Sequence, residues 1–283
     1  MQKAKKSGVN VCAVVVTFNR KEVLQKCLKA LQNQTIPPDE VIVIDGPSTD
    51  GTTQLMKEKF PEVTYIRLNE DVGGAGGFYE GMKLAYKKGY DWIWTMDDDA
   101  IPERDALEKL LAVVNGDQNL IARPAVIDAH HFAPWFAGGI FSRATIKRIG
   151  LPLKELFIYF DDAEYVMRAQ KAGIKTVDVK NAKMNHKDWL LRGCVSKKIL
   201  HKTIKRPKYP KGRKYYYIQR NNLYVHTIHR EWKVLFRLLT INLASNLIKY
   251  LLLGDKEKAL AIIKGTIDYF RRKTGKSLWA HKQ

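Results

Sequence analysis

The chain has 283 residues, of which 45% are hydrophobic and 10% aromatic. That content supports a substantial core and excludes an intrinsically disordered protein, and the length fits one large α/β domain or a domain with a sizeable C-terminal addition. A net charge of +20 predicts an anionic partner, which charge alone does not resolve into nucleic acid, anionic lipid or phosphorylated substrate.

The first two-thirds of the chain alternates between strand-like and helix-like segments. Apolar β-branched runs predict strands at residues 11–17, 40–45, 63–68, 90–96 and 175–179. Amphipathic segments predict helices at residues 21–34, 49–59, 76–88, 103–114 and 165–173. This repetition predicts a mostly parallel, doubly wound α/β sheet whose strand carboxyl ends share one edge and form the ligand crevice there.

Polar groups follow the first two expected strands. The first strand ends in Thr17, Phe18, Asn19 and Arg20. The second ends in Asp45, where a carboxylate is placed to accept hydrogen bonds from a nucleotide base or ribose. The following residues 48–50 are equally typical of an ordinary turn and helix N-cap.

A glycine-rich segment follows the third expected strand and Asn69. Its four glycines in five positions permit the backbone to approach a bulky anionic ligand just before a helix N-terminus. They are Gly73, Gly74, Gly76 and Gly77. The segment is not the dinucleotide-binding fingerprint, because Tyr79 stands in the place of its third glycine.

Three consecutive aspartates, residues 97–99, follow the apolar run 92–96. Adjacent like charges repel, and a cation among them offsets that cost. Alternate side chains of an extended chain share a face, so Asp97 and Asp99 are expected to converge on one cation while Asp98 points elsewhere. The alternative is a solvated acidic turn that caps the next helix.

A second acidic pair, Asp161 and Asp162, precedes the helix expected from residue 165. One of the two suits a helix cap, and the other is left as a general base for a hydroxyl group. His186 follows the strand expected at 175–179. A lone histidine is more often structural, but a site with two carboxylates and no third protein ligand favours metal binding.

The character of the chain changes after the last expected strand. Residues 187–214 hold eleven Lys or Arg and one acid, and residues 232–253 are largely apolar but contain Arg237 and Lys249. Such interior charges favour an amphipathic helix, packed on the domain or lying in a membrane interface, over a membrane span. We therefore expect two domains, residues 1–190 and a basic, helical extension at 191–283.

The motifs together resemble a known family. They are Val14-Val15-Val16-Thr17-Phe18-Asn19-Arg20, Asp45 with Ser48-Thr49-Asp50-Gly51-Thr52, and the aspartate triplet. This series resembles the family 2 glycosyltransferases, which have the nucleotide-sugar-binding GT-A fold. The finer pattern adds Asn69, Gly73-Gly74-Ala75-Gly76-Gly77-Phe78, Asp161-Asp162-Ala163-Glu164-Tyr165 and Arg168-Ala169. It resembles the galactofuranosyltransferase branch and its rhamnosyltransferase relatives over roughly residues 9–190, with a weaker echo at Tyr216, Arg220 and Asn221.

The resemblance implies an inverting hexosyltransferase that moves a sugar from a nucleotide donor to a hydroxyl of a glycan or polyprenyl-linked acceptor in surface polysaccharide synthesis. Asp97, Asp99 and His186 would hold Mn²⁺ or Mg²⁺, and Asp162 would be the catalytic base. The nucleotide sugar would contact Thr17, Phe18, Asn19, Arg20, Asp45, Asn69, Asp98 and the four glycines. The acceptor would contact Trp135, Phe136, Gly138, Gly139 and Asp161, for the first four of which core packing is an equal alternative.

Two further expectations concern the donor and the location. UDP-galactofuranose is favoured and dTDP-rhamnose is the alternative, because Gly46-Pro47 replaces the asparagine usual in the family and leaves base specificity less secure. With no signal peptide expected and three cysteines without CxxC spacing, the protein is expected to be cytoplasmic and peripheral on an anionic membrane surface. A nucleic-acid-binding protein or an inactive sugar-binding module would not explain the acids, and no nucleic acid partner is expected.

Overall fold

The structure, a computed structural model, describes residues 8–127, 134–186, 194–199, 202–207 and 212–281. The chain divides into two compact units. The first comprises Met1–Lys154 and Asp161–His186, and the second comprises Glu155–Phe160 and Lys187–Gln283. Much of the basic stretch 187–214 lies outside the described residues, namely at 187–193, 200–201 and 208–211.

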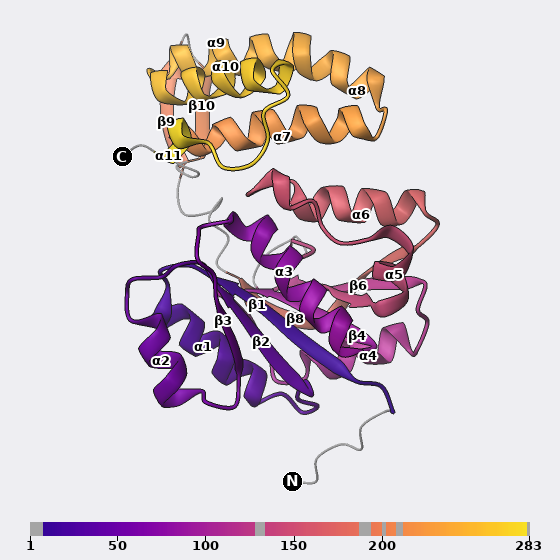
Figure 1. Cartoon of the computed structure of the whole chain (residues 1–283). Helices are drawn as coiled ribbons and strands as arrows, with labels where there is room; N and C mark the ends of the chain where they lie inside the picture. Colours follow the sequence, from indigo (N-terminus) through magenta and orange to yellow (C-terminus); the bar gives the residue numbers. More distant parts are fainter. Residues whose placement is uncertain (1–7, 128–133, 187–193, 200–201, 208–211, 282–283) are drawn as a thin grey trace. The chain divides into compact units, whose positions relative to one another are not determined.

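The first unit contains an eight-stranded sheet in the order β3-β2-β1-β4-β7-β6-β8-β5 (Figure 1). Its strands are β1 (Val11–Thr17), β2 (Glu40–Asp45), β3 (Thr64–Arg67), β4 (Trp92–Asp97), β5 (Ala100–Pro102), β6 (Leu120–Val126), β7 (Ile140–Ser142) and β8 (Lys175–His186). Strands β3, β2, β1 and β4 are parallel, whereas β7 is antiparallel to both β4 and β6 and β5 is antiparallel to β8. The sheet is therefore mixed, with a parallel half that contains the nucleotide-side motifs.

Helices cover both faces of this sheet, because alternate strand residues enter two different cores. Val11, Ala13 and Val15 of β1 pack in one core, and Cys12 and Val14 in the other. The first core receives α1 (Lys21–Gln32), α2 (Thr52–Lys59) and α4 (Ala106–Val114). The second receives α3 (Gly73–Lys88), α5 (Arg143–Ile149) and α6 (Asp161–Lys171). This three-layer arrangement leaves the strand ends as the place where polar groups meet.

The expected elements of this unit are present, with several shifted boundaries. Helices α2 and α4 each begin three residues later than expected, at Thr52 and Ala106. Helix α3 begins at Gly73, three residues earlier than expected, and α6 begins at Asp161, four residues earlier. Strand β8 continues past residue 179 to His186 because it pairs with β6 and then with β5. Strands β5, β6 and β7 and helix α5 were not expected from the sequence. Strands β5 and β7 have only three residues each, and Pro124 interrupts the strand pattern of β6.

All four glycines lie in the first turns of α3, whereas only Gly76 and Gly77 were expected within this helix. A Cβ at Gly77 would lie 2.5 Å from Val16 Cγ1, and one at Gly81 would lie 2.3 Å from Val14 Cγ1. These two glycines therefore allow the helix to pack directly on β1. Gly74 has no such neighbour within 4 Å, so packing does not explain it.

The second unit combines a hairpin with helices. The hairpin is formed by β9 (Cys194–Ile199) and β10 (Lys202–Pro207). The helices are α7 (Tyr215–Ile228), α8 (Trp232–Arg237), a π-helical turn (Leu238–Asn242), α9 (Leu243–Leu252), α10 (Lys256–Phe270) and α11 (Leu278–His281). Helix α10 lies close against α7, where a Cβ at Gly265 would be 2.6 Å from the Tyr216 carbonyl oxygen. Segment Trp232–Leu252 is one continuous helical run, and its length and composition would allow it to cross a membrane.

Candidate active site

Three neighbouring parallel strands bring their carboxyl ends to one edge of the sheet. In the β-sheet register, Thr17 of β1 lies beside Asp45 of β2, and Val16 lies beside Asp97 of β4. The first, second and fourth strand-end motifs of the sequence are therefore adjacent in space. This is the geometry expected of a ligand crevice at the carboxyl ends of a parallel sheet.

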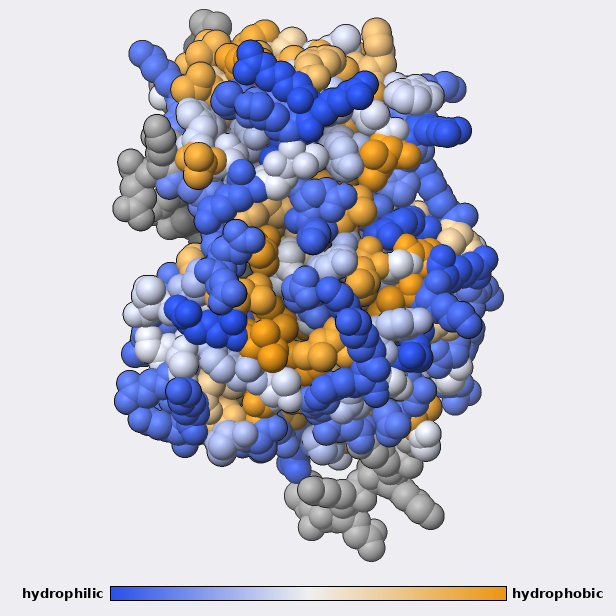
Figure 2. Space-filling view, viewed as in Figure 1, coloured by the Kyte–Doolittle hydropathy of each residue, from blue (hydrophilic) through white to orange (hydrophobic). Residues whose placement is uncertain are grey.

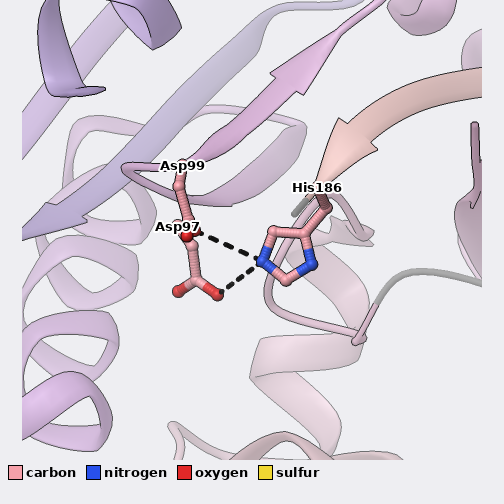
Figure 3. A group of neighbouring side chains, drawn as sticks. All are labelled: Asp97, Asp99 and His186. Atoms are coloured by element: carbon pink, nitrogen blue, oxygen red, sulfur yellow. Dashed lines mark ion pairs between the residues drawn. The ribbon is translucent and has the colours of Figure 1, made fainter. Parts of the chain in front are cut away.

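The short strand β5 brings His186 to the aspartates. It begins directly after the triplet and pairs antiparallel with the end of β8, so that Ala100 lies opposite His186. The histidine Nε2 is 3.3 Å from Asp99 Oδ1 and 3.7 Å from Asp97 Oδ2 (Figure 3). One potential ligand atom from each of the three residues lies within 4.8 Å of the other two.

The chemistry of this cluster fits a divalent metal ion. Two carboxylate oxygens and one imidazole nitrogen are a donor set suited to Mn²⁺ and compatible with Mg²⁺. Burial lowers the pKa of His186, but hydrogen bonds and charge from Asp97 and Asp99 outweigh it and raise that pKa to about 10. The two carboxylates thus favour a positive charge beside them. A bound metal ion would provide that charge, and His186 would then coordinate it as a neutral imidazole.

Arg20 and Thr17 bind the carboxylates of Asp98 and Asp99 from the side of β1. Arg20 forms ion pairs with Asp98 at 2.8 Å and Asp99 at 2.7 Å, and Thr17 Oγ1 donates to Asp98 Oδ2 at 2.8 Å. Burial opposes ionisation of Asp99, yet His186 and Arg20 lower its pKa to about 2. Asp98 points away from the metal cluster, as expected, and burial raises its pKa to about 7 against the effect of Arg20. Its role within the protein is to anchor Thr17 and Arg20.

The residues expected near the nucleoside form a second connected group. Asp45 is fully buried and accepts hydrogen bonds from Ser48 Oγ and the Tyr65 hydroxyl. The Asn19 amide N–H donates to Ser48 Oγ at 2.7 Å, and Asn19 Oδ1 accepts from the Thr49 backbone at 2.7 Å. Ser48 is therefore more than a turn residue, because it connects the ends of β1 and β2.

Phe18 and Gly46 explain the departure from the family pattern. The Phe18 side chain is 43% exposed, and a Cβ at position 46 would lie 2.8 Å from its ring carbon Cδ2. Glycine at this position therefore leaves room for the aromatic ring. Asn69 lies apart from these contacts as an exposed residue after β3.

Asp161 and Asp162 occupy the first turn of α6. Asp162 Oδ2 accepts from the Trp135 backbone N–H at 3.0 Å, and its Oδ1 accepts from the Ala163 N–H at 2.8 Å. Burial is the main cause that raises the pKa of both carboxyls, and the negative charge of Asp97 adds to it. Both residues therefore belong to the electrostatic environment of the metal cluster.

The four residues expected at the acceptor side have different environments. Phe136 is buried against Phe78 and Phe141, with ring centroids 4.9 and 5.6 Å away. The Gly138 carbonyl accepts from Trp94 Nε1, and the Gly139 carbonyl accepts from the Thr95 N–H. These three residues have packing roles, whereas Trp135 is half-buried and contacts Asp162 through its backbone.

Two supports of the site have roles that the sequence did not predict: Tyr65 was not singled out, and Glu164 and Arg168 were named only within the family pattern. Tyr65, in the edge strand β3, donates to Asp45 at 2.6 Å. Arg168 forms a two-point ion pair with the buried Glu164 and donates to the Leu151 carbonyl, which fixes α6 to the preceding loop. The i, i+4 spacing of Glu164 and Arg168 was the available signal for the second support.

The sheet and the acidic strand ends define a glycosyltransferase of the GT-A fold. The model of the family "Glycosyl transferase family 2" matches residues 12–165, and the chain therefore belongs to that family. The expected family, fold and enzyme class are thus confirmed.

Relatives and solved structures agree with this assignment. The chain is 28% identical to galactofuranosyltransferase GlfT1 of Mycolicibacterium smegmatis and 30% identical to GlfT1 of Mycobacterium tuberculosis, over 58% of this chain and 66% of each relative. It thus spans just under two-thirds of those proteins.

Its fold is similar to mannosyltransferase PcManGT from Pyrobaculum calidifontis, solved with GDP-Man and Mn²⁺, with a TM-score of 0.57 and 16% identity over 96% of this chain and 77% of that one. It is also similar to S. aureus TarS, with a TM-score of 0.51 and 17% identity over 62% of this chain and 36% of that one. At these identities the two structures establish the fold.

Proposed function

We propose that the protein is a metal-dependent, inverting glycosyltransferase that moves galactofuranose from UDP-galactofuranose to a hydroxyl of a glycan or polyprenyl-linked acceptor in surface polysaccharide synthesis. The observation that carries this proposal is the Asp97–Asp99–His186 cluster at the same strand edge as the residues around Asp45. The similarity to two galactofuranosyltransferases favours the sugar. The alternative donor is dTDP-rhamnose.

The metal cluster would bind the donor diphosphate. Asp97, Asp99 and His186 would hold Mn²⁺ or Mg²⁺, and the solved mannosyltransferase relative carries Mn²⁺. When bound, the metal supplies a Lewis acid that neutralises the charge developing on the leaving nucleoside diphosphate. Asp97 is 41% exposed at its side chain, so the cluster is accessible to a diphosphate from solvent.

Asp162 would be the general base. It would take the proton of the acceptor hydroxyl as that oxygen attacks the anomeric carbon from the face opposite the diphosphate. The bond from the anomeric carbon to the diphosphate oxygen then breaks, a new glycosidic bond forms with inverted configuration, and the nucleoside diphosphate leaves. Burial raises the pKa of Asp162, which makes its carboxylate a stronger base than an exposed one.

The remaining groups would orient the two substrates. Phe18, Asn19 and Arg20, which are not buried, would contact the nucleoside directly. Thr17, Asp45 and Asp98 are buried and would support these contacts from beneath. Of the four glycines, Gly73 and Gly74 at the N-terminus of α3 would approach the donor most closely. Trp135 and Asp161, next to the base, would contact the acceptor.

The second unit would attach the enzyme to an anionic membrane surface on the cytoplasmic side. Helices α8 to α10 expose large apolar side chains, among them Trp232, Phe236 and Phe270. Apolar and charged residues are mixed on this part of the surface (Figure 2). This mixture suits a helix group lying in the lipid interface, where acceptors with a polyprenyl chain are found.

A screen of nucleotide sugars tests the proposal. UDP-galactofuranose, dTDP-rhamnose and UDP-glucose are each added with Mn²⁺ or with EDTA, and the melting temperature and nucleotide release are measured. We expect UDP-galactofuranose to raise the melting temperature only with Mn²⁺, and the double variant Asp97→Asn/Asp99→Asn to lose that effect. Asp162→Asn should keep the thermal shift and lose transfer by about 10³-fold or more. If no UDP- or dTDP-sugar binds in a metal-dependent way, the proposal is wrong.

A further inference from the structure

The segment Glu155–Phe160 has an unusual backbone. Phe157, Tyr159 and Phe160 have φ values of 66°, 66° and 68°, in the left-handed region. An L-residue in that region costs roughly 1–2 kcal/mol, and bulky aromatic residues adopt it rarely. Three such residues within four positions persist only where surrounding groups impose the conformation, and such strain gathers at functional sites.

The group that imposes it is the side-chain amide of Asn221, on α7. This residue is fully buried, and its Nδ2 donates to the carbonyl oxygens of Leu156 at 2.8 Å, Ile158 at 2.9 Å and Tyr159 at 2.9 Å. One amide group therefore collects three carbonyls of the strained segment. An extended or helical backbone would not point three carbonyls of four consecutive residues at a single donor.

Arg220 fixes the orientation of this amide. Its Nε donates to Asn221 Oδ1 at 3.0 Å, which turns the amide nitrogen toward the segment. Its Nη2 donates to the Leu156 carbonyl at 3.2 Å, and its guanidinium lies about 5 Å from the ring centres of Tyr216 and Tyr217. The Arg220 side chain is only 2% exposed. Burying a charged side chain costs free energy. Arg220 and Asn221 both donate to backbone carbonyls of this segment, and ordinary packing does not explain that arrangement.

The strained segment is joined directly to the catalytic helix. Phe160 is followed by Asp161 and Asp162, which form the first turn of α6. The segment is therefore covalently continuous with the turn that carries the Asp162 carboxylate.

We propose that Arg220 and Asn221 form a carbonyl clamp that positions Asp162 through the segment Glu155–Phe160. They are positioning residues, because they contact the segment and not the reacting atoms. The proposal rests on the role of Asp162 as the base.

The test replaces Asn221 by a residue of the same shape. Asn221→Asp substitutes an acceptor oxygen for the donor nitrogen, so that a carboxylate faces the three carbonyls. Leu223→Ala is the matched control, because Leu223 is equally buried two residues further along α7 but packs against Leu235 and Leu238. Turnover of UDP-galactofuranose with an octyl galactofuranoside acceptor, binding of UDP with Mn²⁺, and hydrogen exchange of residues 155–165 are measured below the melting temperature of each variant.

We expect Asn221→Asp to lower kcat by about 100-fold, the effect of a displacement of about 1 Å of a reacting group. The Kd for UDP with Mn²⁺ should change less than about twofold, since the metal cluster is built from β4 and β8, and exchange in 155–165 should increase. Leu223→Ala should leave kcat within about threefold and exchange in this segment unchanged. If Asn221→Asp does not fold, Arg220→Lys replaces it, with an expected loss of about tenfold in kcat.

Two results would overturn the clamp. One is a kcat for Asn221→Asp close to that of the native protein while exchange in 155–165 rises. The other is an equal loss of kcat in Leu223→Ala. Asp162→Asn separates this inference from the proposed function: if that variant retains transfer, the base assignment and the clamp both fail. If it abolishes transfer while Asn221→Asp and Arg220→Lys remain fully active, only the clamp fails.

Discussion

Asp161 and Asp162 are two adjacent carboxyls in a buried helix turn, and their proximity has an energetic cost. Burial raises the pKa of Asp161 well above its ordinary value, and the charge of Asp162 raises it further. The folded protein therefore binds a proton at Asp161 more tightly than the unfolded chain does. By linkage, stability is lost as the pH rises from the unfolded pKa of about 3.9 through the raised folded pKa.

This cost predicts that Asp161→Asn stabilises the protein at neutral pH. Asparagine keeps an oxygen for the helix N-terminus but carries no charge. At pH 7 without metal, we expect the melting temperature to rise by about 2–4 °C, which corresponds to about 1 kcal/mol for a unit of this size. The rise should shrink as the pH falls and vanish near pH 4, where the native carboxyl is protonated in the folded protein.

The control for this prediction is Glu58→Gln, on the exposed surface of α2. It should change the melting temperature by less than about 1 °C at either pH, as surface substitutions usually do. An Asp161→Asn variant with a lower melting temperature at pH 7, or with the same rise at both pH values, would contradict the linkage.

At the level of single residues, the sequence predicted the acids better than their partners. Asp97 and Asp99 follow from the two-residue periodicity of a strand, which is a local property. His186 is 87 positions beyond Asp99, and it reaches the aspartates only through the pairing of β5 with β8. Tyr65 was missed for the same reason, because its contact with Asp45 depends on strand register.

At the level of secondary structure, the glycines of α3 had two interpretations. The sequence predicted that the backbone approaches an anionic ligand at the start of a helix expected from residue 76, and the structure places all four glycines within a helix that packs on β1. Composition cannot separate the two, since both require the absence of a side chain. The two glycines differ in the space available for a side chain: a Cβ at Gly81 would clash with Val14, whereas a Cβ at Gly74 would meet no atom within 4 Å.

The packing interpretation predicts opposite effects for two alanine substitutions. Gly81→Ala places a methyl group 2.3 Å from Val14 Cγ1, and such overpacking typically costs about 1–3 kcal/mol. Gly74→Ala meets nothing within 4 Å and should gain about 0.5–1 kcal/mol from the higher helix propensity of alanine. Urea unfolding of both variants measures the difference, and a Gly81→Ala variant as stable as the native protein would exclude tight packing at this position.

The sheet itself shows where prediction from sequence ends. Long apolar strands such as β1, β2 and β4 were found with boundaries correct to within two residues, and their parallel order follows from the crossover rule. The antiparallel strands β5 and β7 have three residues each, too few to give a periodic signal. Strand β5 is nevertheless essential to the site, because it follows the aspartates directly and pairs with the end of β8, which carries His186.

At the level of the whole molecule, the second unit differs from the C-terminal extension expected at residues 191–283. Its segment Glu155–Phe160 comes from within the first domain of the sequence, which no local pattern indicated. Its helices α8 and α10 expose large apolar side chains, among them Trp232, Phe236 and Phe270. Within the described residues, exposed bases such as Lys233, Arg237 and Arg271 accompany them.

The membrane proposal predicts binding to anionic vesicles that depends on both features. The protein should bind vesicles containing about 30% phosphatidylserine more tightly than vesicles of phosphatidylcholine, because each basic residue near such a surface contributes about 1 kcal/mol. High salt, near 1 M, should weaken the binding but leave an apolar contribution, since the Debye length falls to about 3 Å there.

The apolar contribution is tested by removing two exposed side chains of the helical run. Phe236 and Ile241 are 70% and 67% exposed, and Phe236→Ser/Ile241→Ser should lower vesicle partitioning by about tenfold or more, the loss expected for about 1.4 kcal/mol of apolar burial. Ile66→Ser/Val113→Ser is the matched control, because both residues are exposed apolar side chains of the first unit. Sedimentation with vesicles measures all three proteins. Equal partitioning of the two double variants would mean that α8 and its continuation do not enter the lipid interface, and that any attachment is electrostatic.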